Sequence, residues 1–293
     1  MSETALPPGK KLLGPSLESI RQHYELSNEF FALWLDPLML YTCAFYDGTD
    51  DFAEAQVRKL DHHIEAANAA GKDHVLDLGC GWGALSNRLV GHAGVKRATG
   101  LTLSAEQAKW ARERALPGVE IRLEDWRDHK PEKPYDAILA VGLFEHLAHH
   151  GIEPAKKAAA YREFFTWCEK WLAPAGRLTL QFTAWTLPPS SYMRQRFTFI
   201  QDMIFPDSEL PYMQEVFTAA EGHFEVLALR NDREHYYRTL RQWEANLMAN
   251  RKEAIALVGE EAVDNVRHYL RLSAGAFKIH QISLLRMSFQ RAV

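Results

Sequence analysis

A glycine cluster is the first feature of this sequence that indicates chemistry. The segment Asp77-Leu78-Gly79-Cys80-Gly81-Trp82-Gly83 follows a short β-rich run and precedes a helical pattern. Glycines at such a turn let the chain reverse sharply and bring its backbone close to a ligand. In an open α/β sheet, the carboxyl end of a strand is where ligands bind. The turn therefore predicts a cofactor site.

Two cofactor classes fit this turn. A nicotinamide or flavin dinucleotide needs Gly-x-Gly-x-x-Gly or Ala, and Gly79, Gly81 and Ala84 satisfy that spacing. It also needs an acid about twenty residues later for the ribose hydroxyl, and residues 99–103 contain none. S-adenosylmethionine (SAM) needs an acid just before Gly-x-Gly, and Asp77 occupies that place. The sequence favours SAM.

A carboxylate and an imidazole stand side by side in Phe144-Glu145-His146. Methyl transfer from a sulfonium is an in-line displacement, so its catalysis is chiefly positioning in a matched cavity. If the acceptor is an alkene, the resulting cation needs aromatic faces and a base that removes a proton. Glu145 and His146 are candidate bases, and Glu145 could raise the pKa of His146. Aromatic residues that could wall the cavity are Tyr24, Phe30, Trp34, Tyr41, Phe45, Trp185, Phe197, Phe199, Tyr236 and Phe277.

The histidines are not interpreted as metal ligands. His146, His149 and His150 have the spacing of metal ligands, but no carboxylate or cysteine partner is evident, so we expect no metal. His62 and His63 fall on a polar helix face, where we expect them to be solvated.

Alternating strands and helices must position these groups. Short β-rich runs occur at residues 74–78, 98–101, 119–123, 135–141, 177–183, 224–229 and 282–289. Helical patterns separate most of them, which indicates βαβ units and a parallel sheet. Further helical patterns cover residues 17–35, 52–70 and 235–277. We expect a flexible tail at 1–15, a helical N-terminal cap at 16–71, and a cofactor-binding domain at 72–293 with helical lid insertions near 185–220 and 231–281.

The composition is that of a globular protein. It is 47% hydrophobic and 25% charged, and 34 Lys plus Arg against 38 Asp plus Glu leave a net charge of −4. This balance opposes a nucleic-acid partner. The 3 cysteines form no CxxC pair, and the start shows no apolar leader. No apolar run reaches the length of about 18 residues that spans a bilayer. We expect a cytoplasmic protein with at most peripheral membrane contact.

Several motifs, in this order, resemble the cyclopropane-fatty-acid and mycolic-acid synthase family of SAM-dependent enzymes. They are His23-Tyr24-x-x-Ser27-Asn28-x-Phe30-Phe31, Leu35-Asp36-Pro37, Tyr41-Thr42-Cys43-Ala44-Phe45, Leu76-Asp77-x-Gly79-Cys80-Gly81-Trp82-Gly83, Gly100-Leu101-Thr102-Leu103-Ser104-x-x-Gln107, Phe144-Glu145-His146, Ile204-Phe205-Pro206, Leu210-Pro211, His235-Tyr236-x-x-Thr239-Leu240-x-x-Trp243, Tyr269-Leu270 and Ala274-Gly275-Ala276-Phe277. The resemblance implies the class I SAM-methyltransferase fold, an α/β (Rossmann-like) doubly wound sheet. It also implies a helical N-terminal segment and helical insertions that cover the active site.

The resemblance implies a cofactor role for eight residues besides Asp77. Tyr41 and Thr42 contact SAM from the N-terminal segment, Gly79 and Gly81 lie against its methionine part, Thr102 and Gln107 hold ribose and adenosine, and Asp125 and Trp126 flank the adenine. An indole such as that of Trp126 suits stacking on a base.

The resemblance also implies a reaction centre. In the family a bicarbonate, held by a Glu, a His, a Tyr and backbone near two Cys positions, is the proposed base. Glu145, Tyr236 and Cys43 match the Glu, the Tyr and the first Cys. The family's His falls on Gln181, which donates a hydrogen bond but carries no positive charge, and its second Cys falls on Ser273.

The leading functional hypothesis is SAM-dependent transfer of a methyl or methylene group to a double bond of an unsaturated acyl chain. S-adenosylhomocysteine (SAH) is the expected by-product. The alternative is an N- or C-methyltransferase that acts on a small hydrophobic metabolite such as an amine or isoprenoid. Related plant N-methyltransferases of the coclaurine type use a Glu-His pair at this place. A binding protein with an inactive site and a dinucleotide-dependent oxidoreductase are disfavoured by Glu145 and by residues 99–103, respectively.

Overall fold

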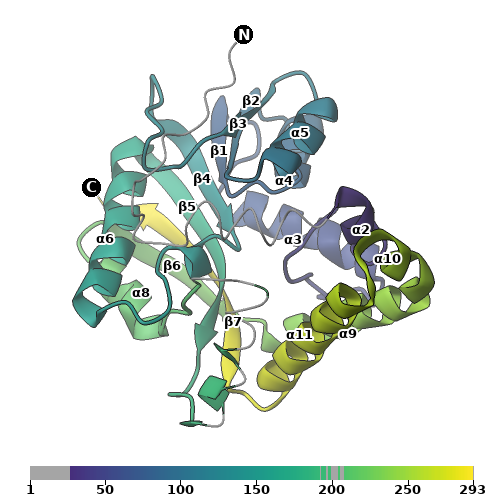
Figure 1. Ribbon diagram of the computed structural model, residues 1–293. Helices are drawn as coiled ribbons and strands as arrows, with labels where there is room; N and C mark the ends of the chain where they lie inside the picture. Colours follow the sequence, from purple (N-terminus) through teal and green to yellow (C-terminus); the bar gives the residue numbers. More distant parts are fainter. Residues whose placement is uncertain (1–26, 192, 196, 199–203, 205–207, 293) are drawn as a thin grey trace.

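A seven-stranded sheet forms the centre of the molecule (Figure 1). The computed structural model describes residues 27–191, 193–195, 197–198, 204 and 208–292. The strands are β1 (His74–Leu78), β2 (Arg97–Thr102), β3 (Val119–Leu123), β4 (Tyr135–Val141), β5 (Leu172–Trp185), β6 (Phe224–Asn231) and β7 (Ile282–Arg291). Their order is β3-β2-β1-β4-β5-β7-β6. The predicted doubly wound α/β fold is confirmed.

The direction of β7 differs from that expected for the predicted parallel sheet. Strands β3, β2, β1, β4 and β5 pair in parallel, whereas β7 is antiparallel to both β5 and β6. The reason lies in the connection after β6. Helices α9 (Arg233–Ala249), α10 (Arg251–Val258) and α11 (Glu260–Lys278) begin where β6 ends and close where β7 begins. The chain therefore re-enters the sheet from the end at which it left, and β7 must run the opposite way.

Helices cover both faces of the sheet because its central strands are buried on both sides. In β4, Ala137 and Leu139 pack in one cluster with α3 (Phe52–Ala66) and α4 (Ala84–Gly91). Ile138 and Ala140 pack in another with α6 (Pro154–Trp171) and α8 (Met213–Ala220). This alternation follows from the two-residue period of a strand. Helix α5 (Ala105–Glu113) packs near β3.

A third apolar cluster joins the N-terminal segment to the late helices. Phe30 of α2 (Asn28–Ala32) and Trp34 share it with Trp243 and Leu247 of α9 and Val263 of α11. The rings of Trp34 and Trp243 meet edge to face, with centroids 5.8 Å apart. In Figure 1 these helices gather at one end of the sheet. They form a helical layer that can cover a ligand bound there.

Several expectations concern residues outside the described ranges. The tail at 1–15, the helical pattern before Ser27, and His23, Tyr24, Phe199, Phe205 and Pro206 belong to this group. Within the described part, the expected cap at 16–71 is helical at α2 and α3, and residues 33–51 between them are not helical.

Candidate active site

A cavity of about 250 Å³ lies where β1, β2, β4 and β5 meet the helical layer. This volume is just below the range of about 300–1,000 Å³ that is usual for small-molecule sites. The predicted site residues that line it are Tyr41, Thr42, Asp77, Gly79, Gly81, Thr102, Gln107, Trp126, Glu145, His146, Gln181 and Tyr236. Residues that lie far apart in the sequence are thus brought to one site.

Gly81 and Gly83 are required at the turn for different structural reasons. Gly81 has a φ of +54°, and a Cβ built on it would meet nothing within 4 Å. Because Gly81 lines the cavity, that open space belongs to a ligand. Gly83 has a φ of +85°, and its Cβ would lie 3.0 Å from Ala111 Cβ on α5. Gly81 therefore gives room to a bound molecule, and Gly83 gives room to a helix.

Asp77, at the end of β1, is a buried carboxyl group in the cavity wall. Ser86 Oγ donates a hydrogen bond to its Oδ2 at 2.8 Å. Burial raises the pKa of Asp77 to about 7, and the hydrogen bond from Ser86 opposes this rise. A cationic group in the cavity would favour the ionised form. The carboxyl group suits a cofactor that carries an amino group.

The end of β2 offers a polar pair in place of the acid that dinucleotides need. Thr102 Oγ1 donates to Gln107 Oε1 at 2.8 Å. Ser104 caps α5 by accepting the N–H of Gln107 at 3.2 Å, which fixes the start of the helix. With its oxygen occupied, the Gln107 amide has N–H groups left for a ligand. This pair fits a ribose or adenosine contact.

The loop after β3 presents Trp126 and Glu124 to the cavity but not Asp125. Asp125 is buried (4% exposed), and its Oδ1 accepts the backbone N–H of Arg127 at 2.9 Å. The side chain of Asp125 is engaged in this local hydrogen bond, and its neighbours Glu124 and Trp126 line the cavity. Trp126 packs edge to face on Phe164, with centroids 5.6 Å apart. The expected adenine contact of Asp125 stays a prediction.

Lys59 on α3 is a cavity residue that the sequence analysis missed. Its side chain is fully buried, and its Nζ donates to Thr42 Oγ1 at 2.6 Å and to Gln56 Oε1 at 2.8 Å. Gln56 Nε2 in turn donates to the backbone oxygen of Thr42 at 3.1 Å. Burial lowers the pKa of Lys59 to about 7, and the charge of Asp36 opposes this shift. The sequence signal that could have identified Lys59 was the presence of Gln56 and Lys59 three residues apart, and thus on one face of the predicted helix.

Glu145 lies in the short helix η1 (Phe144–His146) with one oxygen held and one unpartnered. The backbone N–H of Thr183 donates to its Oε1 at 2.6 Å. Its Oε2 is buried and has no hydrogen-bond partner among the described residues. Burial raises the pKa of Glu145 to about 7 and lowers that of His146 to about 4. Since an unpartnered buried carboxylate is costly, this oxygen must carry a proton or meet a ligand.

Aromatic rings form much of the remaining wall, as expected. Those that line the cavity are Tyr41, Trp82, Trp126, Trp185, Phe197, Tyr236, Tyr269 and Phe277. The rings of Tyr236 and Phe277 are 4.7 Å apart, and those of Trp185 and Phe197 are 4.5 Å apart. Phe30 and Trp34 are instead buried core residues that do not line it.

Cys43 does not line the cavity. Its side chain is fully buried, and burial raises the pKa of its thiol to about 11, so the thiol stays neutral. The backbone oxygen of Cys43 accepts a hydrogen bond from Arg286 Nη2 at 3.1 Å. A part in catalysis through the backbone stays a prediction. Ser273 does line the cavity.

The expectation that His62 and His63 are solvated is wrong for His63. It is 1% exposed, because the face of α3 that carries it packs on β5. Its ring nitrogens lie 3.3 Å from Thr179 Oγ1 and 3.5 Å from Gln181 Oε1. Burial lowers its pKa well below the usual value, so the ring is neutral. His62 is half-buried and stacks on Phe45, with centroids 4.7 Å apart.

Two further properties of the described residues bear on function. They contain no group of three or more His, Cys, Asp and Glu side chains arranged for a metal ion. His150 does have a carboxylate neighbour, since its Nδ1 lies 3.1 Å from Glu209 Oε2, but these two side chains belong to no such group. None of the helices seen in the described ranges is both long and apolar enough to span a membrane.

Comparison with known proteins identifies the family. Residues 13–287 match the family model of mycolic acid cyclopropane synthetase. The chain is 32% identical over 295 residues to cyclopropane mycolic acid synthase 1 of Mycobacterium tuberculosis, covering 95% of this chain and 99% of that protein. It is 31% identical over 274 residues to the cyclopropane-fatty-acyl-phospholipid synthase of Escherichia coli, covering 93% of this chain and 68% of that protein.

Solved structures agree with this assignment. The crystal structure of mycolic acid cyclopropane synthase CmaA1 complexed with SAH and CTAB matches with a TM-score of 0.85 at 32% identity, covering 95% of this chain and 99% of that chain. Coclaurine N-methyltransferase, at 23% identity and a TM-score of 0.75, shares the fold, covering 96% of this chain and 84% of that chain. Because the family model covers nearly the whole chain and relatives above 30% identity do the same, the protein belongs to the mycolic acid cyclopropane synthetase family of SAM-dependent methyltransferases.

Proposed function

We propose that this protein methylates a carbon–carbon double bond of an unsaturated acyl chain and yields a cyclopropane or a methyl branch. The observation that carries the proposal is the unpartnered, buried Oε2 of Glu145 at an aromatic-walled cavity. The names of the mycobacterial and Escherichia coli relatives, which are cyclopropane synthases, support an acyl acceptor.

The residues present fit SAM, which when bound supplies an electrophilic methyl group on a positively charged sulfur. Gly81 leaves space that a Cβ would fill. Asp77 offers a carboxyl group to the amino end of the cofactor, and the Thr42 hydroxyl with Lys59 offers donors to its carboxylate. Thr102 and Gln107 would hold the sugar and base. Together these contacts would hold the cofactor in the cavity beside the aromatic residues of its wall.

The reaction centre must stabilise positive charge and then remove a proton. Methyl addition to an alkene leaves a cation on the acyl chain, and ring closure releases one proton. The faces of Tyr236 and Phe277 can stabilise that cation. A pKa of about 7 makes Glu145 an effective base near neutral pH, whereas His146, with a pKa of about 4, is a weaker one. We assign the base to Glu145, acting directly or through a bicarbonate bound beside it.

The test is product analysis with isotope-labelled SAM. Purified protein is incubated with lipids that carry monounsaturated or saturated acyl chains of equal length. We expect a mass gain of one CH₂ only in the unsaturated lipid. In NMR, loss of the alkene proton signals would identify a cyclopropane, whereas a new methyl signal beside a retained double bond would identify a methyl-branched alkene. Methylation of small amines or isoprenoids and of no lipid would overturn the proposal.

The alternative acceptor, a small hydrophobic metabolite, is favoured by one observation. The cavity volume of about 250 Å³ leaves little room for a long chain beside a cofactor. We therefore include amines and isoprenoids in the same assay.

We also place the reaction in the cytoplasm, because Cys43, Cys80 and Cys168 are all free thiols.

A further inference from the structure

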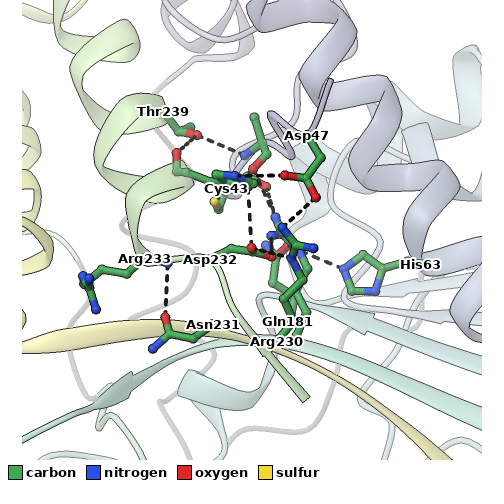
Figure 2. Close-up of polar contacts among 12 residues, drawn as sticks. Cys43, Asp47, His63, Gln181, Arg230, Asn231, Asp232, Arg233 and Thr239 are labelled. Atoms are coloured by element: carbon green, nitrogen blue, oxygen red, sulfur yellow. Dashed lines mark hydrogen bonds and ion pairs between the residues drawn. The ribbon is translucent and has the colours of Figure 1, made fainter. Parts of the chain in front are cut away.

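Arg286 on β7 is a buried arginine directly behind the cavity wall. It is 2% exposed and lies opposite Gln181 of β5 in the antiparallel register. Its Nε donates to Gln181 Oε1 at 2.9 Å, and its Nη1 pairs with Asp232. Its Nη2 donates to the backbone oxygens of Cys43 and Ala44, each at 3.1 Å. Figure 2 shows Gln181, Asp232 and Cys43, which come from three segments of the chain, near one another.

These contacts fix which way the Gln181 carboxamide points. A guanidinium only donates hydrogen bonds, so Gln181 must turn its oxygen toward Arg286. The reversed carboxamide would place N–H groups against N–H groups. The neutral His63 supports the same orientation, because its Nε2 lies 3.5 Å from that oxygen and can donate to it. The Gln181 amide nitrogen therefore points away from both donors.

Gln181, Thr183 and Glu145 all line the cavity. Gln181 and Thr183 lie two residues apart on β5, so their side chains share one face of the strand. The backbone N–H of Thr183 holds Glu145 Oε1 at 2.6 Å. Gln181 and the candidate base thus border the same cavity, where the amide N–H groups of Gln181 can meet a ligand.

The charge of Arg286 stays behind the wall. Asp232, 4% exposed, pairs with it and also accepts a hydrogen bond from Arg230 Nε at 2.6 Å. Asp232 stands just before α9, and its backbone oxygen accepts the N–H of Tyr236 at 3.2 Å. Arg286 therefore also ties the helix that carries Tyr236 to the sheet.

We infer that Arg286 is a positioning residue that holds Gln181 as a fixed, uncharged N–H donor to an oxygen acceptor at the reaction centre. The family resemblance puts a histidine, which can gain or lose a proton, at the position of Gln181. Here the donor does not titrate. The inference rests on the proposed function, because it takes the reaction centre to be at Glu145.

A double-mutant cycle with Arg286→Lys and Gln181→Met tests this inference. Lysine keeps a positive charge beside Asp232 but does not reproduce the planar set of donors that orients Gln181. We expect each single variant to lower kcat by at least about 10-fold, roughly the worth of one charge-assisted hydrogen bond. In the Gln181→Met background, Arg286→Lys should lower kcat by less than a further factor of about 3, because the carboxamide that Arg286 orients is absent. Equal losses in both backgrounds would refute the inference and leave Arg286 a purely structural clamp.

A second variant keeps the test decisive if Arg286→Lys fails to fold. Gln181→Glu keeps an acceptor for Arg286 but lacks the N–H donor. We expect an unchanged melting temperature with kcat reduced as in Gln181→Met, and wild-type kcat in this variant would overturn the inference. Arg230→Gln is the matched control, because Arg230 contacts Asp232 but is not in contact with Gln181 in the described structure, and its kcat should match the wild type.

The outcomes separate this inference from the proposed function. Wild-type protein that methylates no unsaturated lipid defeats the proposed function, and the cycle is then run on whichever acceptor is methylated. If no acceptor is found, the same four proteins are compared by thermal unfolding. Melting-temperature changes that simply add would refute the Arg286–Gln181 coupling itself.

Discussion

Replacing Glu145 with glutamine should stabilise the protein while removing its activity. The substitution keeps an oxygen that can accept the Thr183 N–H and keeps the side-chain shape. It removes the charge that a buried carboxylate would otherwise carry in an apolar cavity. A stability gain that accompanies a loss of function is typical of a strained catalytic group.

The magnitude follows from the pKa of Glu145. Burial raises it from 4.5 to about 7 in the folded protein, and one pKa unit corresponds to 1.36 kcal/mol. The upper bound is thus about 3 kcal/mol, and because the cavity admits solvent we expect about 1–3 kcal/mol. For a chain of this length, each kcal/mol moves the melting temperature by about 2 °C, so the expected increase is roughly 2–6 °C.

The size of the stability difference depends on pH. Below about 4.5 the carboxyl is protonated in both folded and unfolded chains, and the two proteins should be equally stable. As pH rises from 4.5 through about 7, only the unfolded wild type releases its proton freely, so the wild type loses stability relative to Glu145→Gln. The advantage of the variant should be complete above pH 7.

The assay compares melting temperatures at pH 5 and pH 8 for the wild type, Glu145→Gln and the control Glu132→Gln. Glu132 is exposed in a loop, so its substitution should have little effect at either pH. We also expect kcat for Glu145→Gln to fall by at least about 100-fold with SAM affinity within a few fold of the wild type.

Three outcomes would contradict this reasoning. A variant no more stable than the wild type at pH 8 would show that the folded protein does not raise the Glu145 pKa. An active variant would move the base elsewhere, with His146 the next candidate. An equal loss of SAM binding and turnover would reassign Glu145 to the cofactor.

Three further predictions concern the cavity. Gly81→Ala should weaken SAH binding at least about 10-fold in calorimetry, because its Cβ fills ligand space. Gly83→Ala should chiefly lower the melting temperature, because its Cβ presses on Ala111. Equal SAH affinity in wild type and Gly81→Ala would refute the cofactor placement. Lys59, whose pKa burial lowers to about 7, must be protonated to bind a carboxylate, so its contribution to SAH affinity should fall as pH rises from 7 to 9. Because Asp77 ionises in the same range and acts in the opposite direction, the measurement compares wild type with Lys59→Met, whose affinities should converge as pH rises. Phe277→Ala should reduce kcat for an unsaturated acyl acceptor more than it reduces SAH affinity, and the reverse ratio would place Phe277 at the cofactor.

The sheet could be predicted from the sequence because its strands are short apolar runs closed by turn residues. The runs at 74–78, 119–123 and 135–141 have the same bounds as β1, β3 and β4. Strand β7 was predicted in place but not in direction. Its direction depends on where α9 to α11 pack, and no local pattern encodes that packing.

The candidate site could be predicted where a motif fixes both residue and backbone, as at Gly79 and Gly81. Prediction was weaker where orientation decides the role. Asp125 and Glu124 are adjacent acids, but Glu124 lines the cavity, whereas Asp125 accepts a local hydrogen bond from the backbone of Arg127. His63 looked solvated because its partners Thr179 and Gln181 lie more than 100 residues away.

Arg286 shows what signal such distant partners leave in a sequence. It interrupts the apolar run 282–289, in which every position is buried. In a strand that is buried on both faces of its sheet, a charged side chain strongly destabilises the fold unless another chain segment supplies a counter-charge and hydrogen-bond acceptors. An arginine inside such a run therefore predicts a hidden carboxylate and further polar partners, although it does not identify them. Asp232 and Gln181 meet that requirement here, and the need to satisfy Arg286 is also what turns Gln181 toward the cavity.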